Sequence, residues 1–379
     1  MTSRNTCAAV VVSIAIATTA VPPATAQIAD DELTFRARLG ADYLVSVQLP
    51  NGLFAYEYDF LAAGLVEADS IVRQAGTAFG VAVYLNWSGV EAYRESVKRA
   101  LAALAAYSRP YDEGMVLASR DRPSEAPTGA TALALLAELN YVEATGDTAF
   151  EETRRGWVRA LTALQNPAGG MDMAPNIPVE SPFYNGEAWL ALAHYNRLFP
   201  EDALAANVLT DADDYLMDLY TEAPNPSFFQ WGLMAAAVRY RVTGDPRFLD
   251  FIAGQSEAYL TDLSPSVRPT NNGCAAVEGL AAGAAALASA KRDVDSLHQR
   301  MLTRIDAELT KSLGFQIMPG QGHIRLGAER HLVDPGVARF AGAVLNGRYQ
   351  ARTRVDSTVH CLSALINYEQ MRQARGGRR

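Results

Sequence analysis

The stretch "EATGDTAFEE", from Glu143 to Glu152, recurs 98 residues later as "RVTGDPRFLD", from Arg241 to Asp250. In both copies a Thr-Gly pair is typical of a helix end, because glycine readily adopts the left-handed conformation that follows the last turn. The aspartate after it is a favoured cap for the start of a second helix. The stretch therefore predicts a tight connector between two helices, and its return indicates an internally repeated chain.

Around these connectors, glycine and proline divide the chain into units of roughly fifty residues that each hold two helices. One helix of each unit is rich in small apolar residues on all sides, as in "TGATALALLAELN" from Thr128. A helix without a polar face must be buried on most sides, so these helices predict an inner ring. We expect inner helices over 71–85, 128–144, 186–198, 229–242, 273–290 and 356–371.

The other helix of each unit has one apolar stripe and one charged face, as in "VEAYRESVKRALAALAAY" from Val90. Such a pattern is typical of a helix that faces solvent. We expect outer helices over 33–47, 90–107, 150–165, 206–219, 248–260 and 294–312. No stretch alternates at period two and no strand-to-helix glycine fingerprint occurs, which disfavours parallel-sheet folds. The pattern predicts an all-α (α/α)6 toroid as one domain over 27–372, with an open α-solenoid as the alternative.

The two ends of the chain differ from this pattern. Residues 1–26 hold one arginine, an apolar run over 8–17 and a small-residue "ATA" site, which is the layout of a secretory signal peptide. We therefore expect a periplasmic or secreted protein without a membrane span in the mature chain. Residues 373–379 form a basic C-terminal tail. Cys274 and Cys361 could pair in an exported chain or remain free thiols.

The loops that lead from each outer helix into the next inner helix should all open at one end of the toroid. They are longer and richer in aromatic and polar residues than the opposite connectors, which predicts that they carry the function. Together with the first turns of the inner helices they would line a cavity that suits a sugar, whereas the simpler interpretation is that they cap helices. The predicted substrate-binding residues are Tyr58, Arg73, Gln74, Tyr184, Trp231, Asn272, Arg352 and His360.

Candidate catalytic carboxylates lie on the same face. Glycoside hydrolysis needs two carboxyl groups, one to protonate the leaving oxygen and one to activate water or attack carbon. Glu187 in "YNGEAW" and Asp356 in "RVDSTVH" each lie about one turn into an inner helix, and we predict that they form the acid/base pair. Asp59 in "YEYDF" is the substitute for either. First-turn acids can also serve only to stabilise the helix dipole.

A local excess of cations keeps a second chemistry open. From His323 to Arg354 the chain holds six arginines and two histidines against Glu329 and Asp334, although the net charge of the chain is −9. A lyase or epimerase on a uronic acid needs cations beside the sugar carboxylate and a Tyr or His to move the C5 proton. Tyr58 or His360 would then transfer the proton, and Arg73, Arg352 or Arg354 would bind the carboxylate.

Other ligands have less support. The acidic balance disfavours nucleic acid, whose binding depends on cations that neutralise phosphates. The histidines lack the tight grouping of a catalytic zinc site, so we expect no metal and no cofactor. "DADD" at 211–214 matches the DxDD pattern of terpene cyclases, but its place after Thr210 favours a helix cap at the start of an outer helix.

"NGLFAYEYDF" from Asn51, "VRQAG" from Val72 and "RTRVDSTVHCLSALINYE" from Arg352 resemble the six-hairpin glycosidase-like superfamily, with some similarity to the helical domain of glucuronyl C5-epimerase-like proteins. The resemblance implies a toroid over nearly all of the mature chain and carbohydrate chemistry on its loop face. That superfamily includes hydrolases, lyases, epimerases and phosphorylases. The chain lacks the β-rich domain that usually precedes the toroid in the epimerase-like proteins, which weakens that option.

The sequence therefore predicts an exported, metal-independent carbohydrate-active enzyme, foremost a glycoside hydrolase, whose partner is a poly- or oligosaccharide that could be anionic. The alternatives are a polysaccharide lyase or C5-epimerase acting on a uronic-acid-containing glycan, and a non-catalytic glycan-binding or scaffold protein of an envelope assembly system.

Overall fold

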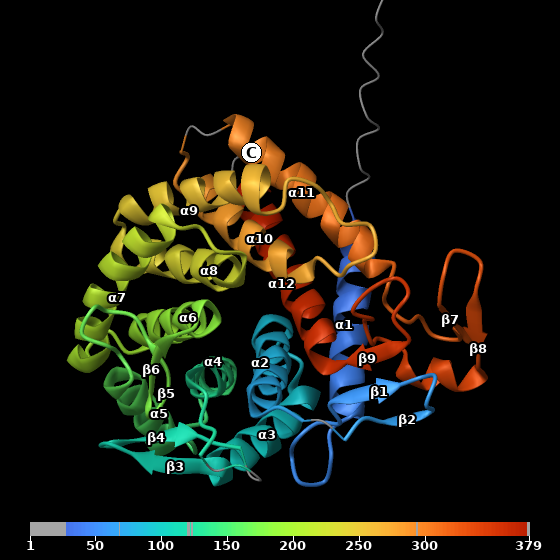
Figure 1. Cartoon of the computed structure of the whole chain (residues 1–379), viewed down its shortest axis with the longest axis horizontal. Helices are drawn as coiled ribbons and strands as arrows, with labels where there is room; N and C mark the ends of the chain where they lie inside the picture. Colours follow the sequence, from blue (N-terminus) through green and yellow to red (C-terminus); the bar gives the residue numbers. More distant parts are fainter. Residues whose placement is uncertain (1–27, 68, 120–121, 123, 293–294, 377–379) are drawn as a thin grey trace, which may run out of the picture.

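The computed structural model describes residues 28–67, 69–119, 122, 124–292 and 295–376 (Figure 1). The predicted signal peptide over residues 1–26 lies outside the described residues. The last helix continues to Gly376, so the helix includes the first half of the predicted tail over 373–379. Within the described residues, no helix is both long and apolar enough to cross a membrane.

The helices form two concentric rings, as the sequence predicts (Figure 1). The inner ring consists of α2 (Ile71–Ser88), α4 (Thr128–Thr145), α6 (Pro182–Leu198), α8 (Pro226–Thr243), α10 (Cys274–Ser289) and α12 (Val355–Gly376). The outer ring consists of α1 (Asp30–Ser46), α3 (Arg94–Tyr107), α5 (Glu151–Ala163), α7 (Ala203–Glu222), α9 (Arg247–Ala258) and α11 (Asp295–Leu313). Each inner helix packs on the next, and α12 packs on α2 and α1. This closure confirms the toroid and excludes the open solenoid.

Small side chains allow the inner helices to pack closely on all sides. In α4 every residue from Thr128 to Tyr141 is buried. Alanine and glycine bring helix axes near one another, and leucine side chains fill the remaining space, so apolar burial supplies most of the stability. The connectors end α4 and α8 as predicted, since Gly146 and Gly244 adopt left-handed conformations with φ of 68° and 71°. The predicted aspartate caps are wrong, because the residues that precede α5 and α9 directly are Phe150 and Pro246.

The loops from outer to inner helices carry the short strands of the structure. They pair as antiparallel hairpins, namely β1 (Glu57–Asp59) with β2 (Gly64–Leu65), β3 (Ser108–Tyr111) with β4 (Gly114–Leu117), β5 (Asp172–Ala174) with β6 (Ile177–Glu180), and β7 (His323–Arg325) with β8 (His331–Val333). β9 (Arg352–Arg354) joins the other edge of β1, so that Glu57 faces Arg354 and Asp59 faces Arg352. The first and last loops of the chain are thereby joined on the loop face.

Short helical turns complete the chain between these elements. η1 (Glu91–Tyr93) precedes α3, the π-helical turn η2 (Tyr259–Leu263) extends α9, and η3 (Pro335–Phe340) follows β8.

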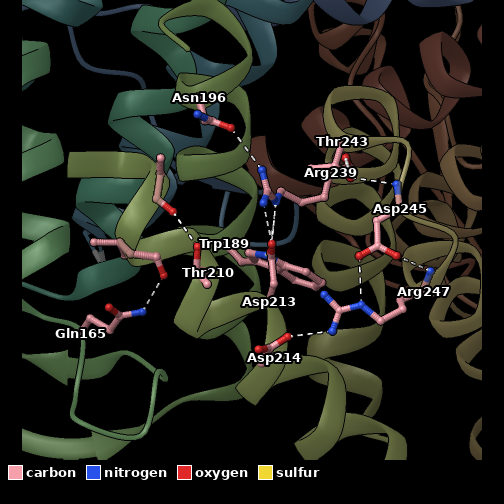
Figure 2. A network of polar contacts seen from close by, with 12 residues as sticks. Gln165, Trp189, Asn196, Thr210, Asp213, Asp214, Arg239, Thr243, Asp245 and Arg247 are labelled. Carbon is pink, nitrogen blue, oxygen red and sulfur yellow. Dashed lines mark hydrogen bonds and ion pairs between the residues drawn. The ribbon is translucent and has the colours of Figure 1, made fainter. Parts of the chain in front are cut away.

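The "DADD" segment lies inside α7, so the prediction that it caps an outer helix is wrong. α7 begins at Ala203, and its cap is Asp202, whose side chain accepts from the backbone N–H of Leu204. Asp213 is buried and accepts from Arg239 Nη2 at 2.6 Å and from the Trp189 indole N–H at 2.7 Å (Figure 2). These contacts join α7 to the inner helices α6 and α8, and none of the three residues lines the cavity described below, so Asp213 has a structural role.

Cys274 and Cys361, which the sequence left as either a pair or two thiols, form a disulfide. The bond joins the first residue of α10 to α12 across a sequence separation of 87 residues. A covalent link between distant segments restricts the unfolded chain, so it stabilises the contact between these two inner helices.

The adjacent aspartates 213 and 214 give a matched test of this packing. Asp213→Ala leaves the Arg239 guanidinium buried without its carboxylate partner, with only Asn196 still accepting from it. We expect the change to lower the free energy of unfolding by about 3–5 kcal/mol. Asp214 is 61% exposed and pairs with Arg247 at the surface, so Asp214→Ala should cost less than about 1 kcal/mol. Urea unfolding of the two variants measures the difference. Equal losses of unfolding free energy would contradict the structural role of Asp213.

Candidate active site

A cavity of about 300 Å³ opens at the loop face, where the first turns of the inner helices meet. Charged, amide and aromatic side chains from five inner helices converge on it. The residues that carry its chemistry are Arg73 of α2, Tyr184 and Glu187 of α6, Gln230 and Trp231 of α8, Glu278 of α10, and Asp356 and His360 of α12. Phe79, Leu133, Phe183 and Val359 add apolar surface.

Glu187 supplies a protonated carboxyl group to this cavity. It lies in the second turn of α6, its side chain is buried, and Oε2 has no hydrogen-bond partner among the residues that the structure describes. Burial raises the pKa of Glu187 to about 8, while the charges of His360 and Arg73 oppose the rise only in part. At neutral pH the group therefore carries a proton that it can donate.

Gly129 makes room for this carboxyl group. A Cβ atom on Gly129 would lie only 2.0 Å from Glu187 Oε2 and 2.5 Å from the Tyr184 ring. Glu187 therefore packs directly on the backbone of α4, where only glycine leaves space. This contact buries the carboxyl group on the side that faces α4.

Whereas Glu187 is protonated, Asp356 is ionised. Arg73 Nε donates to its Oδ2 at 2.7 Å, and Arg354 Nε donates to its Oδ1 at 3.0 Å. Burial would raise the pKa of Asp356, but the hydrogen bonds and charges of Arg354 and Arg73 outweigh it and lower the pKa to about 2. A carboxylate that is ionised and bound in this way is a weak base, so the geometry favours a positioning role for Asp356 over the predicted acid/base role.

Glu278 and His360 form a second titratable pair that the sequence reasoning did not find. His360 Nδ1 lies 2.9 Å from Glu278 Oε2, and the Gln230 amide also donates to that oxygen. Burial would lower the pKa of His360, but the charge and hydrogen bond of Glu278 raise it above the usual 6.5. Burial also raises the pKa of Glu278. The carboxylate fixes the Nδ1–H tautomer, which leaves His360 Nε2 as the ring atom that can accept a proton.

The disulfide lies directly beside this pair. Cys361 follows His360 in α12, and Cys274 lies one helical turn before Glu278 in α10. The covalent bond therefore holds the two helices at the level where the imidazole and the carboxylate meet.

One feature of the sequence could have drawn attention to Glu278. Glu278 is the only charged residue in "GCAAVEGLAAGAAALA", but Glu138 is equally isolated in "TGATALALLAELN" of α4. The two differ in depth along the helix, because Glu278 is the fifth residue of α10 whereas Glu138 is the eleventh of α4. Glu138 lies far from the loop face, buried with Arg154 at 2.7 Å, and has a structural role.

Arg73 is the cation that faces the cavity. Its side chain is 37% exposed, and only its Nε is bound to Asp356. The guanidinium group also lies 5.6 Å from the centroid of the Tyr56 ring. Its outer nitrogens remain available to a ligand, since none of them has a hydrogen-bond partner within the part of the chain that the structure describes.

Of the predicted site residues, the structure brings together Glu187, Asp356, Arg73, Tyr184, Trp231 and His360. The others lie outside the lining of this cavity. Asp59 and Arg352 pair with one another at 2.9 Å in the β1–β9 sheet, and Tyr58 accepts from Arg339.

Gln74 and Asn272 also have partners elsewhere. Gln74 is buried and bonds both the N–H and the C=O of Phe54. Asn272 lies just before α10 and accepts from the Cys274 N–H.

Two further observations bear on other chemistries. Among the described residues, no group of three or more His, Cys, Asp or Glu is arranged to hold a metal ion. A larger groove of about 610 Å³ lies between α7 and α9 on the outside of the ring. Two of its three acids, Asp214 and Asp250, are paired with Arg247 and Arg292. The inner cavity, on which titratable groups of several inner helices converge, is therefore the candidate site.

No family model matches the sequence, and no curated protein is similar to it in sequence. Solved structures share the fold at low identity. The GH76A α-1,6-mannanase from Salegentibacter sp. HEL1_6 superposes with a TM-score of 0.64 at 11% identity, over 89% of this chain and 99% of that one. An unsaturated glucuronyl hydrolase specific for heparin gives 0.63 at 13%, over 91% and 99%. D-mannose isomerase gives 0.63 at 12%, over 93% and 100%. These similarities confirm the (α/α)6 toroid fold.

The buried Glu187 predicts a pH-dependent stability difference. The pKa of its carboxyl group is about 4.5 when exposed and about 8 in the fold, so folding costs free energy as the pH rises through this window. Glu187→Gln removes that cost. We expect the variant to match the wild type near pH 4.5 and to exceed its unfolding free energy by about 1–4 kcal/mol at pH 8. Thermal unfolding at both pH values measures this, and a constant difference would contradict the raised pKa.

Proposed function

We propose that this protein is a glycoside hydrolase that acts on an oligo- or polysaccharide bound in the inner cavity, with Glu187 as the general acid. The observation that carries this proposal is the buried Glu187 carboxyl group, which lines a cavity rimmed with aromatic rings and whose Oε2 has no partner in the described part of the chain. Burial raises the pKa of this group to about 8. A general acid must hold a proton at the working pH and lie within reach of the leaving oxygen. Asp356, with a pKa of about 2, does not meet the first condition.

His360, oriented by Glu278, is the corresponding base. In the proposed reaction Glu187 gives its proton to the glycosidic oxygen, and the bond from that oxygen to the anomeric carbon breaks. A water oxygen bonds to the anomeric carbon, and a proton of that water passes to His360 Nε2. The Glu278 carboxylate stabilises the imidazolium that results, as a carboxylate does for a catalytic histidine elsewhere. His360 then releases its proton to solvent and Glu187 takes one up, which returns both groups to their first protonation states.

Arg73, Trp231 and Tyr184 would bind the sugar. Aromatic faces suit the apolar faces of sugar rings, and a guanidinium group can donate two parallel hydrogen bonds to hydroxyl or carboxylate oxygens. Asp356 fixes the direction of Arg73 through Nε. Arg354 binds both oxygens of Asp356 and keeps that carboxylate from turning.

The solved relatives support carbohydrate chemistry but not one particular sugar. The Salegentibacter mannanase was also solved as an inactive variant, with two adjacent aspartates replaced, in complex with α-1,6-mannotriose. Adjacent aspartates occur here at 30–31 and 213–214, and neither pair lines the cavity. We therefore assign the acid to Glu187 and do not propose mannan as the substrate.

An epimerase or lyase acting on a uronic acid is a second candidate, because one observation favours it. His360 with Glu278 is an oriented base, and Arg73 offers free donors in the same cavity. That combination would suit removal of the proton next to a sugar carboxylate. The cavity lined by the buried Glu187 carboxyl group argues against the third alternative, a glycan scaffold without catalysis, since such a protein needs no buried acid in a cavity.

The place of action follows from the N-terminal sequence. A signal peptide over residues 1–26 would deliver the enzyme to the periplasm or the medium. Its partner there would be a polysaccharide of the cell envelope or of the surroundings.

A substrate panel tests the proposal. Purified protein is incubated with neutral and uronic polysaccharides, and reducing ends, unsaturated products and deuterium uptake from D2O are measured. New reducing ends without unsaturated products support hydrolysis. Unsaturated products, or deuterium uptake without hydrolysis, would instead support the lyase or epimerase. No reaction with any glycan would contradict the proposal that the protein is an enzyme.

Matched amide variants test the acid. Glu187→Gln should lower kcat by about 10²–10⁴-fold, because the leaving oxygen is no longer protonated. The loss should be much smaller with a dinitrophenyl glycoside, whose leaving group needs no proton. Asp59→Asn makes the same chemical change outside the cavity and should leave both rates near those of the wild type. The assignment fails if Asp59→Asn is the more damaging variant.

The pH profile follows from the two pKa directions. His360 must be neutral to accept a proton, so kcat/KM should rise through a pKa above 6.5. Glu187 must be protonated, so kcat/KM should fall through a pKa of about 8. The profile is therefore a narrow bell with its maximum between these values. Steady activity from pH 5 to pH 10 would contradict this assignment.

A further inference from the structure

A second cavity of about 250 Å³ adjoins the first on the loop face. The first turns of α8 and α10, the last turns of α11 and the segment after η2 enclose it. Gln230 lines both cavities, and its amide also donates to Glu278. A ligand that passes over Gln230 would therefore lie in both cavities, with one part beside the titratable pair.

The second cavity carries an uncompensated positive charge. Lys311, Glu308 and Arg268 are its charged lining residues. Lys311 is already engaged, because its Nζ donates to Glu308 Oε2 and to the carbonyl oxygen of Arg268. The Arg268 guanidinium group has no hydrogen bond or ion pair with any residue of the described ranges, and Arg268 is exposed.

A further cation lies next to Ser264 and Tyr259, two lining residues of the second cavity. Arg304 is buried, donates to the carbonyl oxygen of Ser264 at 2.7 Å and lies 5.9 Å from the Tyr259 ring centroid. Arg268 and Arg304 both oppose the rise that burial causes in the pKa of Tyr259. Both charges therefore lie near Tyr259, which lines the second cavity. Glu308 is the single acid of the lining, and Lys311 neutralises it.

The cavity also offers neutral hydrogen-bonding groups. Asn271 is exposed at the lip, and its Nδ2 is not used in a hydrogen bond among the described residues. The Gln230 amide contributes an oxygen, since its nitrogen donates to Glu278. Amide groups of this kind pair with the hydroxyl groups of a sugar, whereas a free guanidinium group matches a carboxylate.

We propose that the second cavity is a binding site for an acidic sugar residue, a uronic acid, next to the sugar that reacts in the first cavity. Arg268 binds the carboxylate, and Asn271 and Gln230 bind hydroxyl groups. This inference rests on the proposed function and names the substrate class, an oligosaccharide of at least two rings that carries a carboxylate. The residue at the second cavity adds binding energy and selects acidic over neutral chains.

Binding measurements in the Glu187→Gln chain test this without depending on turnover. The probes are galacturonate oligomers, mannuronate oligomers and neutral mannotriose, titrated calorimetrically into the full-length variant. The test change is Arg268→Gln. The matched control is Arg325→Gln, which removes another exposed arginine on β7, outside both cavities.

At least one acidic oligomer should bind, and Arg268→Gln should weaken that binding by about 10- to 100-fold, as the loss of a charged hydrogen bond to a carboxylate does. The same change should leave mannotriose unaffected and reduce the salt dependence of acidic-oligomer binding. Arg325→Gln should change none of these. Equal effects of the two variants, equal binding of neutral and acidic oligomers, or no binding of any acidic oligomer would overturn the proposal. Cleavage of a neutral glycan with no binding of acidic oligomers would overturn this inference and keep the proposed hydrolase.

Discussion

The buried carboxyl group of Glu187 limits what the inner cavity can do. Its Oε2 packs on the backbone of Gly129 and has no hydrogen-bond partner among the described residues. Ionising such a group would place an uncompensated charge in a poorly solvated site, so the proton stays on at neutral pH. An acid at this place suits reactions that begin by protonating an oxygen. The fold supplies it because an alanine- and glycine-rich inner helix lets another helix approach this closely.

Three carboxyl groups of one cavity are held in different states by their neighbours. Glu187 is neutral through burial, Asp356 is ionised through two arginines, and Glu278 shares a hydrogen bond with His360. Separating the pKa values of neighbouring acids is how a site obtains an acid and a base at one pH. The disulfide and the Arg73–Asp356–Arg354 group fix the helices and side chains around Glu187, so the states follow from the packing of the ring.

The sequence predicted the fold well, because helix patterns and connectors are local. The apolar character of the segment from Thr128 and the Thr-Gly-Asp connectors placed the inner and outer helices within a few residues of their observed ends. The site was only partly predictable. The sequence placed Glu187 and His360 in the lining of the cavity because each lies within the first two turns of an inner helix at the loop face. Glu278 was missed because its role depends on the neighbouring helix α12, and the binding of Asp356 by Arg354 depends on the strand pairing of β9.

A carbon-13 NMR titration of the glutamate side-chain carboxyls would test the central claim most directly. Glu187 is assigned by the resonance that disappears in Glu187→Gln. A midpoint near pH 8 is predicted, well above the value of about 4.5 for an exposed glutamate. A midpoint near 4.5 would show that the carboxyl group is ionised at neutral pH, and Glu187 could not then be the general acid.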